Sequence, residues 1–381
     1  MTHRQPGLDL LRALAIGWVM LYHVASYGVA LPGIVHHGWM GVDLFFVLSG
    51  YLIGAQVLRP YAEGNRPSWR FFLLRRAFRV LPAYLAVLAL YAMLPTVRES
   101  AGLRPLWQFL TFTVNLVPDA GRLAFSHAWS LCVEEHFYLL LPPVVWLLGR
   151  YPGTRRTAAL ALALLVGGML LRGWLWQAEV EPYLGVAGEN GFFVRYVSLI
   201  YNPTWARLDG LLAGVMLAAV QVFRGSWWER ATRWSPLFLA AGLAGLALAM
   251  RIKLDSHFGA IVVFPLVAAS FGCLVLAAAT GRSRFGRLRV PGAAYLAAIS
   301  FSLYLTHKAT FHVVRAQFGD ALAGAGPMAL AVYLAASLAV ATLLYLVVER
   351  PFLRLRDRLL LSDGVGRVRS GRAGSAHAVV P

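Results

Sequence analysis

The sequence predicts an all-α, polytopic membrane protein with about ten transmembrane helices and both termini in the cytoplasm. Three observations support this fold class. Of the 381 residues, 59% are hydrophobic and only 14% are charged. Apolar runs of about twenty residues, the length that crosses a bilayer, recur from one end of the chain to the other. Arginines concentrate in alternate segments between these runs, as expected for cytoplasmic loops.

Composition and charge argue against several other classes of protein. The net charge of +18 would suit a nucleic-acid binder, but the basic residues gather in short loops without an aromatic stacking platform. Cys132 and Cys273 both lie in apolar runs, so there is no disulfide framework and no metal-binding spacing. We therefore expect no metal, no tightly bound cofactor and no nucleic-acid partner.

The N-terminus resembles a secretory signal, because His3 and Arg4 precede an apolar stretch. Arg12 interrupts that stretch, and no small-residue cleavage site follows at the usual distance. We expect this segment to remain as the first membrane helix. The complete set of predicted spans is 8–27, 40–58, 75–94, 128–149, 157–176, 204–223, 235–251, 258–279, 294–317 and 328–349.

Charge predicts the orientation of these spans. With the N-terminus inside, most arginines fall on cytoplasmic segments, and the first outer loop, 28–39, has no arginine or lysine. Residues 1–361 then form one membrane domain, and 362–381 form a cytoplasmic tail whose Gly-, Ser- and Arg-rich composition predicts disorder. Two long outer segments, 95–127 and 177–203, are expected to be interfacial or re-entrant and to meet an external substrate.

Four ionisable side chains are predicted at the outer level. His23 lies near the end of the first span, Asp43 opens the second, and Glu134 and Glu135 open the fourth. Histidine is the usual general base, and a nearby carboxylate can orient its ring. We predict these four as catalytic, with His23 oriented by Asp43 or Glu134. The alternatives are a histidine bonded to a backbone carbonyl and glutamates that join helices or balance a buried arginine.

Other polar side chains lie on the same predicted surfaces. Ser130, Glu134 and Tyr138 recur at i, i+4 and i+8, so they share one helix face. A structural ion pair is the alternative for Arg207, which lies beside Asp209, and an interfacial anchor is the alternative for Trp129. The predicted substrate-binding set is Ser49, Trp129, Ser130, Tyr138, Arg207 and His307.

The inner level is rich in arginine. Arg75, Arg76 and Arg79 open the third span, and Arg12 joins them from the first. Four guanidinium groups at one depth suit phosphates, while ordinary topology signalling is the alternative. On a helix, Arg12 and His23 lie roughly 16 Å apart, so a long ligand could join the two levels. An acyl-CoA thioester fits, with its phosphates at the arginines and its pantetheine arm reaching outward.

Six motifs resemble the acyltransferase-3 family of integral membrane acyltransferases, which O-acetylate sugars of lipopolysaccharide, capsule, Nod factors and some glycosylated natural products. The resemblance implies a ten-helix core, an acyl-CoA donor that is usually acetyl-CoA, and functional roles for Arg12, His23, Glu134 and Glu135. The motifs occur in family order and are Arg12-x10-His23, GVDLFFVLSGYLIG at 41–54, RRAFRVLP at 75–82, WSLCVEEHFY at 129–138, RLDGLLAG at 207–214 and SFSLYLTH at 300–307.

The sequence thus predicts a multi-pass O-acyltransferase of the bacterial cytoplasmic (inner) membrane. It would move an acyl group, most often acetyl, from cytoplasmic acyl-CoA to a hydroxyl of a sugar or glycosylated metabolite. Some family members carry a fused esterase-like domain; here we expect transfer to finish in the membrane core or on a separate partner. A transporter or flippase of a phosphorylated or lipid-linked substrate is the alternative, although repeated halves are absent. A direct transfer and a covalent intermediate both remain open.

Overall fold

The computed structural model describes residues 5–65, 67–117, 122–150, 154–188, 191–281 and 283–359, and these contain helices but no β-strand. The predicted tail, 362–381, falls outside them. A π-helical turn, Tyr345–Glu349, extends the last labelled helix toward residue 359. The helices are α1 (Pro6–Ala25), α2 (Met40–Ala62), α3 (Trp69–Met93), α4 (Leu106–Leu110), α5 (Ala128–Arg150), α6 (Thr154–Leu175), α7 (Phe192–Tyr196), α8 (Asp209–Phe223), α9 (Gly225–Arg233), α10 (Ser235–Ala249), α11 (His257–Ala279), α12 (Arg284–Arg287), α13 (Ala293–Leu322) and α14 (Pro327–Leu344).

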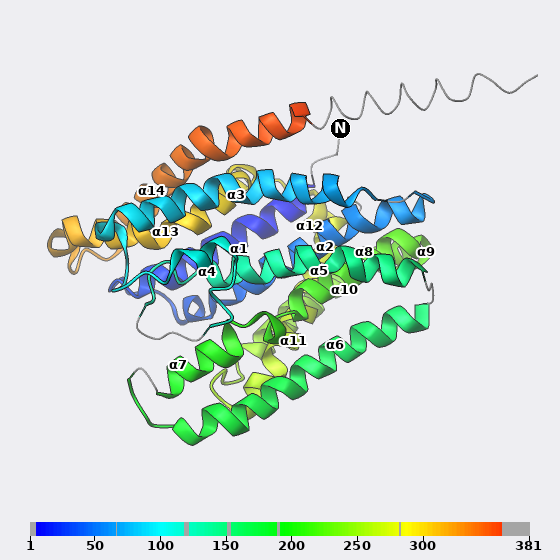
Figure 1. Cartoon of the computed structure of the whole chain (residues 1–381), viewed down its shortest axis with the longest axis horizontal. Coiled ribbons are helices and arrows are strands. Elements are labelled where there is room, and N and C mark those ends of the chain that lie inside the picture. The colour runs from blue at the N-terminus through cyan, green and yellow to red at the C-terminus, as the bar shows by residue number, and fades with distance from the viewer. Residues whose placement is uncertain are drawn as a thin grey trace, which may run out of the picture.

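Every predicted span coincides with one of the longer helices, and these helices run along a common direction (Figure 1). Within the described residues, six helices are long and apolar enough to cross a membrane. The chain is therefore a multi-pass membrane protein. A count of ten spans and the cytoplasmic placement of both termini remain predictions. The spans that pass this test are Pro6–Ala25, Met40–Ala62, Ala128–Leu148, Thr154–Tyr183, His257–Ala279 and Pro327–Leu359.

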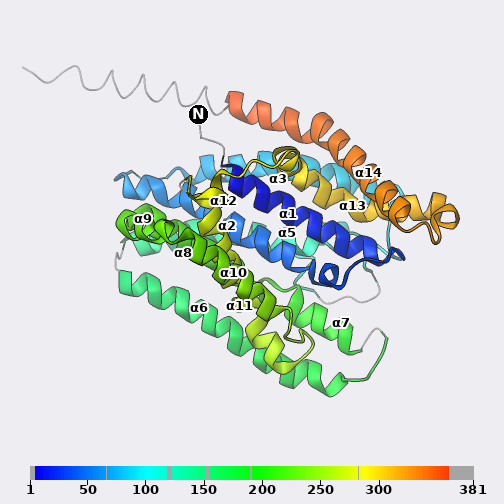
Figure 2. The same cartoon turned by 180° about the vertical axis from the view of Figure 1, so that it is seen from behind.

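Helix α1 occupies the centre of the bundle, where it packs against α2, α11 and α13 (Figures 1 and 2). Pro6 suits the first turn, whose amide groups have no partner within the helix. Leu11, Ile16 and Val24 are almost completely buried between the neighbouring helices. Because lipid tails are as apolar as these side chains, close van der Waals packing rather than exclusion of water holds such helices together.

Glycines bring α2 and α8 into backbone contact. A methyl group at Gly50 would lie 2.2 Å from the Leu211 carbonyl oxygen, and one at Gly214 would lie 2.2 Å from that of Val47. Only glycine allows this approach, which recurs wherever membrane helices pack through small residues. The contact holds the second and fifth sequence motifs against each other and fixes the relative position of their charged residues.

In the described part of the two predicted outer segments, the helical pieces are short, apart from residues 177–183, which continue the span Thr154–Tyr183. Residues 95–127 include α4, which is far too short to span a bilayer. Residues 177–203 include α7 and the π-helical turn Val197–Tyr201 that continues it. Helix α9, in contrast, follows α8 after a bend of 111° and crosses the end of the bundle.

Candidate active site

A cavity of about 140 Å³ lies between α1, α2, α3, α5 and α13. Its polar lining comes from five separate sequence motifs, which the fold brings to one place. Part of this polar lining consists of arginines, and the other part consists of hydroxyl groups and one carboxylate. The polar residues are Arg12, Arg76, Arg79, Ser49, Glu134, Tyr138, Ser130, Ser300 and Tyr304.

Two of the three cavity arginines keep hydrogen-bonding capacity for an anion. Arg79 donates to the buried Glu349 carboxylate at 2.5 Å, so most of its charge is balanced. Arg76 donates to Gln56 at 3.3 Å, and its buried Nε has no hydrogen-bond partner. Arg12 has no carboxylate within ion-pairing distance among the residues described. Buried donors without acceptors are costly, so this arrangement suits a bound anion.

Arg75 does not line this cavity. Its guanidinium instead lies 5.4 Å from the ring centre of Phe71, one turn earlier on α3. Neighbouring positions on a helix point about 100° apart, and this separates Arg75 from Arg76. The predicted set of four phosphate-binding arginines therefore reduces to three that share one cavity.

Glu134 is held by hydroxyl groups at the cavity wall. Ser49 donates to its Oε1 at 2.7 Å, and Tyr138 donates to its Oε2 at 3.2 Å. The structure thus brings together one residue that was predicted as catalytic and two that were predicted to bind substrate. Glu135 points elsewhere and does not line the cavity.

The expectation that Asp43 orients His23 does not fit the structure. Asp43 accepts two hydrogen bonds from one nitrogen of the completely buried Arg207, at 2.8 and 2.9 Å. Arg207 therefore does not pair with Asp209 either; Asp209 binds the guanidinium of Arg172 at 2.8 and 3.1 Å. Each carboxylate pairs with an arginine from a different part of the chain, because an unpaired charge at such depth would be very unfavourable.

Trp129 is part of the Arg207 environment and not of the cavity. Its ring lies 5.2 Å from the Arg207 guanidinium carbon, and Tyr201 and Phe264 lie on the same cation at 4.6 and 4.2 Å. Trp129 is 7% exposed, so it is neither an interfacial anchor nor open to a substrate in this conformation. Aromatic faces around a buried cation stabilise it beyond its ion pair.

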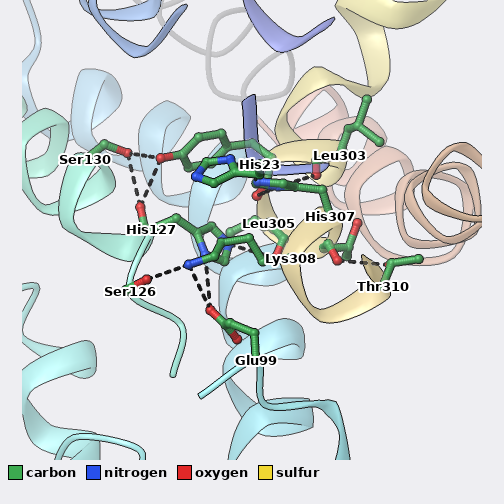
Figure 3. A network of polar contacts seen from close by, with 12 residues as sticks. His23, Glu99, Ser126, His127, Ser130, Leu303, Leu305, His307, Lys308 and Thr310 are labelled. Atoms are coloured by element: carbon green, nitrogen blue, oxygen red, sulfur yellow. Dashed lines mark hydrogen bonds and ion pairs between the residues drawn. The ribbon is translucent and has the colours of Figure 1, made fainter. Parts of the chain in front are cut away.

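His23 has another histidine as its polar partner. His307 of α13 lies with its Nε2 3.1 Å from Nδ1 of His23 (Figure 3). On its other side, Nδ1 of His307 is 2.8 Å from the Tyr304 carbonyl oxygen. Neither Asp43 nor Glu134 orients His23; both expectations fail because those carboxylates are bound by other groups.

A second polar cluster lies beside the histidines, between the 95–127 segment and α13 (Figure 3). Lys308 donates to Ser126 at 2.7 Å and lies 3.3 Å from the Glu99 carboxylate. His127 donates from Nε2 to the Leu305 carbonyl at 3.1 Å, while its Nδ1 is 4.0 Å from Glu99. Burial lowers the pKa of His127 well below 6.5, and the nearby His307 and Lys308 lower it further.

Ser130 and Tyr304 separate the cavity from the histidines. Their hydroxyl groups are 2.6 Å apart and both line the cavity, whereas His23 does not. The Tyr304 hydroxyl also donates to the His127 carbonyl at 3.0 Å, and its backbone carbonyl receives the His307 bond. His23 therefore lies outside this cavity, and Tyr304 lies between the cavity and the His307 ring.

The sequence signal for the second cluster was weak. Glu99 and His127 belong to a loop without periodicity, and nothing in the sequence relates them to α13, about two hundred residues away. Tyr304 lies in the SFSLYLTH motif but resembles any core aromatic. His127 could have been noticed, because it directly precedes the WSLCVEEHFY helix. Among the described residues, no group of histidines, cysteines and carboxylates is arranged to hold a metal ion.

Comparison with known proteins shows the family of the chain. Residues 5–346 match the family profile described as an acyltransferase domain. The chain belongs to this acyltransferase family. It is 28% identical over 230 residues to a Staphylococcus aureus strain COL protein named "Putative O-acetyltransferase", and 27% identical to "O-acetyltransferase OatA" of strain NCTC 8325.

Each of these matches covers 56% of this chain but only 34% of the relative. The chain therefore spans about a third of the length of the curated relatives it matches. No solved structure matches the chain. The family assignment thus comes from sequence alone, and the site must be interpreted from its own geometry.

Proposed function

We propose that this protein is an O-acyltransferase of the bacterial cytoplasmic membrane. It takes an acyl group, most often acetyl, from acyl-CoA on the cytoplasmic side and transfers it to a hydroxyl of a sugar or glycosylated metabolite. The observation that carries the proposal is the cavity of an acyltransferase-family protein, which Arg12 and Arg76 both line and in which the buried Nε of Arg76 has no hydrogen-bond partner. The names of the two relatives point to O-acetyl transfer.

In this proposal, the arginines bind the phosphates of the donor. A volume of about 140 Å³ corresponds to a few water molecules at about 30 Å³ each, far less than a whole coenzyme. The nucleotide end therefore remains at the arginine-lined mouth, and only the slender acyl-pantetheine arm enters. Side-chain movement at Ser130 and Tyr304 lets the thioester approach His23, over a rise of roughly 16 Å along α1.

His23 acts as the general base in the proposed reaction. Its imidazole takes the proton of the acceptor hydroxyl while the hydroxyl oxygen attacks the thioester carbonyl carbon. The carbon–sulfur bond breaks, and the imidazolium returns the proton to the coenzyme thiolate. The products are an O-acyl ester and free coenzyme A, so no other reactant is required.

The direct test uses purified protein in lipid nanodiscs with acetyl-CoA and a mixture of oligosaccharides. We expect release of free coenzyme A and formation of base-labile acetyl esters by the unchanged protein. Substitution His23→Ala should reduce both by at least about 10²-fold, the lower range for general-base catalysis. His36→Ala, at an exposed loop histidine, is the matched control and should have normal activity. Normal activity of His23→Ala would refute the proposal.

A binding experiment tests the donor site without needing turnover. Arg76→Gln removes a charge-assisted contact of about 1.5–3 kcal/mol, so the Kd for coenzyme A should rise roughly 10- to 150-fold. Arg75→Gln changes the neighbouring residue outside the cavity and should leave Kd within about threefold. Equal losses in the two variants would show that the effect is general positive charge and not this cavity.

A further inference from the structure

We infer that His307 is a positioning residue that fixes which nitrogen of His23 is free to accept a proton. This inference rests on the proposed role of His23 as the base. It is carried by two hydrogen bonds that run in series from the backbone of α13, through His307, to the His23 ring (Figure 3).

The first bond defines the protonation of His307. Its Nδ1 is 2.8 Å from the Tyr304 carbonyl and 3.2 Å from the Leu303 carbonyl. A carbonyl oxygen can only accept, so Nδ1 of His307 carries a hydrogen. His307 is completely buried, and none of the described carboxylates forms an ion pair with it. Because an unpaired charge is costly in a buried position, the His307 ring is neutral. Its single ring hydrogen is on Nδ1, so Nε2 holds a lone pair.

The second bond transmits this assignment to His23. Since Nε2 of His307 accepts, Nδ1 of His23, at 3.1 Å, must donate. The free lone pair of a neutral His23 is consequently on Nε2, the nitrogen that points away from His307. A base whose tautomer is fixed in advance has its accepting nitrogen ready in every encounter with substrate.

The surroundings keep this arrangement intact. Lys308, next to His307 in the chain, is bound by Ser126 and Glu99, so its charge is compensated away from the imidazoles. His127 packs edge-on against His307 with ring centres 5.2 Å apart, and its own Nε2 hydrogen is bound to the Leu305 carbonyl. Neither Lys308 nor His127 competes for Nε2 of His307.

Nitrogen-15 NMR of the full chain in nanodiscs, with labelled histidine, tests the tautomer without turnover. The His23 signals are assigned by their loss in His23→Gln. In the unchanged protein we expect a protonated Nδ1 and an unprotonated Nε2 at pH 8. In His307→Leu this preference should weaken, whereas His307→Gln, whose amide oxygen can accept the same hydrogen, should keep it. A protonated Nε2 in the unchanged protein would overturn the inference.

Kinetics give the second readout. His307→Leu should lower kcat by about 10²-fold with KM for acetyl-CoA unchanged, since binding at the arginines is intact. His307→Gln should recover at least about tenfold of that loss. His312→Leu, on the same helix, is the matched control and should have normal kcat. Equal activity of the Leu and Gln variants would contradict positioning. Activity of His23→Ala would instead refute the proposed base, while the NMR result would still decide the tautomer.

Discussion

The buried pair of Asp43 and Arg207 allows a sharp separation of structural and catalytic roles. Asp43 is 2% exposed and Arg207 is 1% exposed, so neither charge has access to water. Asp43→Asn leaves the guanidinium without a counter-ion among the aromatic rings that surround it. Removal of one partner from such a pair costs about 3–5 kcal/mol. This loss is a large fraction of the 5–15 kcal/mol that stabilises a typical protein.

We therefore expect Asp43→Asn to denature earlier and to yield less folded protein. The assay is thermal unfolding of the purified protein in detergent, followed by the rate of acetyl transfer per folded molecule. The double variant Asp43→Asn with Arg207→Met removes both charges and should recover much of the lost stability, because no unpaired charge remains. The rate per folded molecule should fall by less than about tenfold in either variant. Normal thermal stability with a rate loss above about 10²-fold would refute this interpretation and make Asp43 catalytic.

Three other outcomes follow from the structure. Because burial lowers the pKa of His127, the folded protein binds fewer protons than the unfolded chain below pH 6.5, and stability falls with falling pH. Unfolding curves of His127→Gln should accordingly show a flatter pH dependence below pH 6.5 than those of the unchanged protein. Lys308→Met leaves the Glu99 carboxylate buried without its cation, which should cost about 3–5 kcal/mol in the same unfolding assay; unchanged stability would disprove the pair. Gly214→Ala places a methyl group 2.2 Å from the Val47 carbonyl, so α2 and α8 must separate at a cost of about 1–3 kcal/mol, whereas Gly17→Ala, with open space, should be harmless.

The helices were predictable because long apolar runs and arginine-rich loops are properties of the local sequence. Each run that was expected to be a span is a helix, and α1 lies at the centre of the bundle. Helical periodicity likewise predicted the shared face of Ser130, Glu134 and Tyr138, all of which line the cavity. These inferences required only the direction in which neighbouring side chains point.

Pairing between distant helices could not be predicted in the same way. Depth in the membrane placed Asp43, Glu134 and His23 at one level, but it did not give their position around the bundle. The close glycine contact of α2 with α8 places Asp43 beside Arg207. The hydroxyl groups of Ser49 and Tyr138 donate to Glu134 and hold its carboxylate at the cavity wall. His23 consequently lies beside His307, a residue that was expected to bind substrate and for which we propose a positioning role.

The position of the bound donor tests the proposed roles of the arginines and of His23 together. The most direct measurement is an experimental structure of the protein with a non-transferable acetyl-CoA analogue. We expect the phosphates at Arg12, Arg76 and Arg79, and the thioester carbonyl carbon within about 6 Å of Nε2 of His23 after Tyr304 moves aside, so that an acceptor hydroxyl fits between them at about 3 Å from each. A donor bound outside this cavity, or one whose thioester remains on the arginine side of an unmoved Tyr304, would contradict the account.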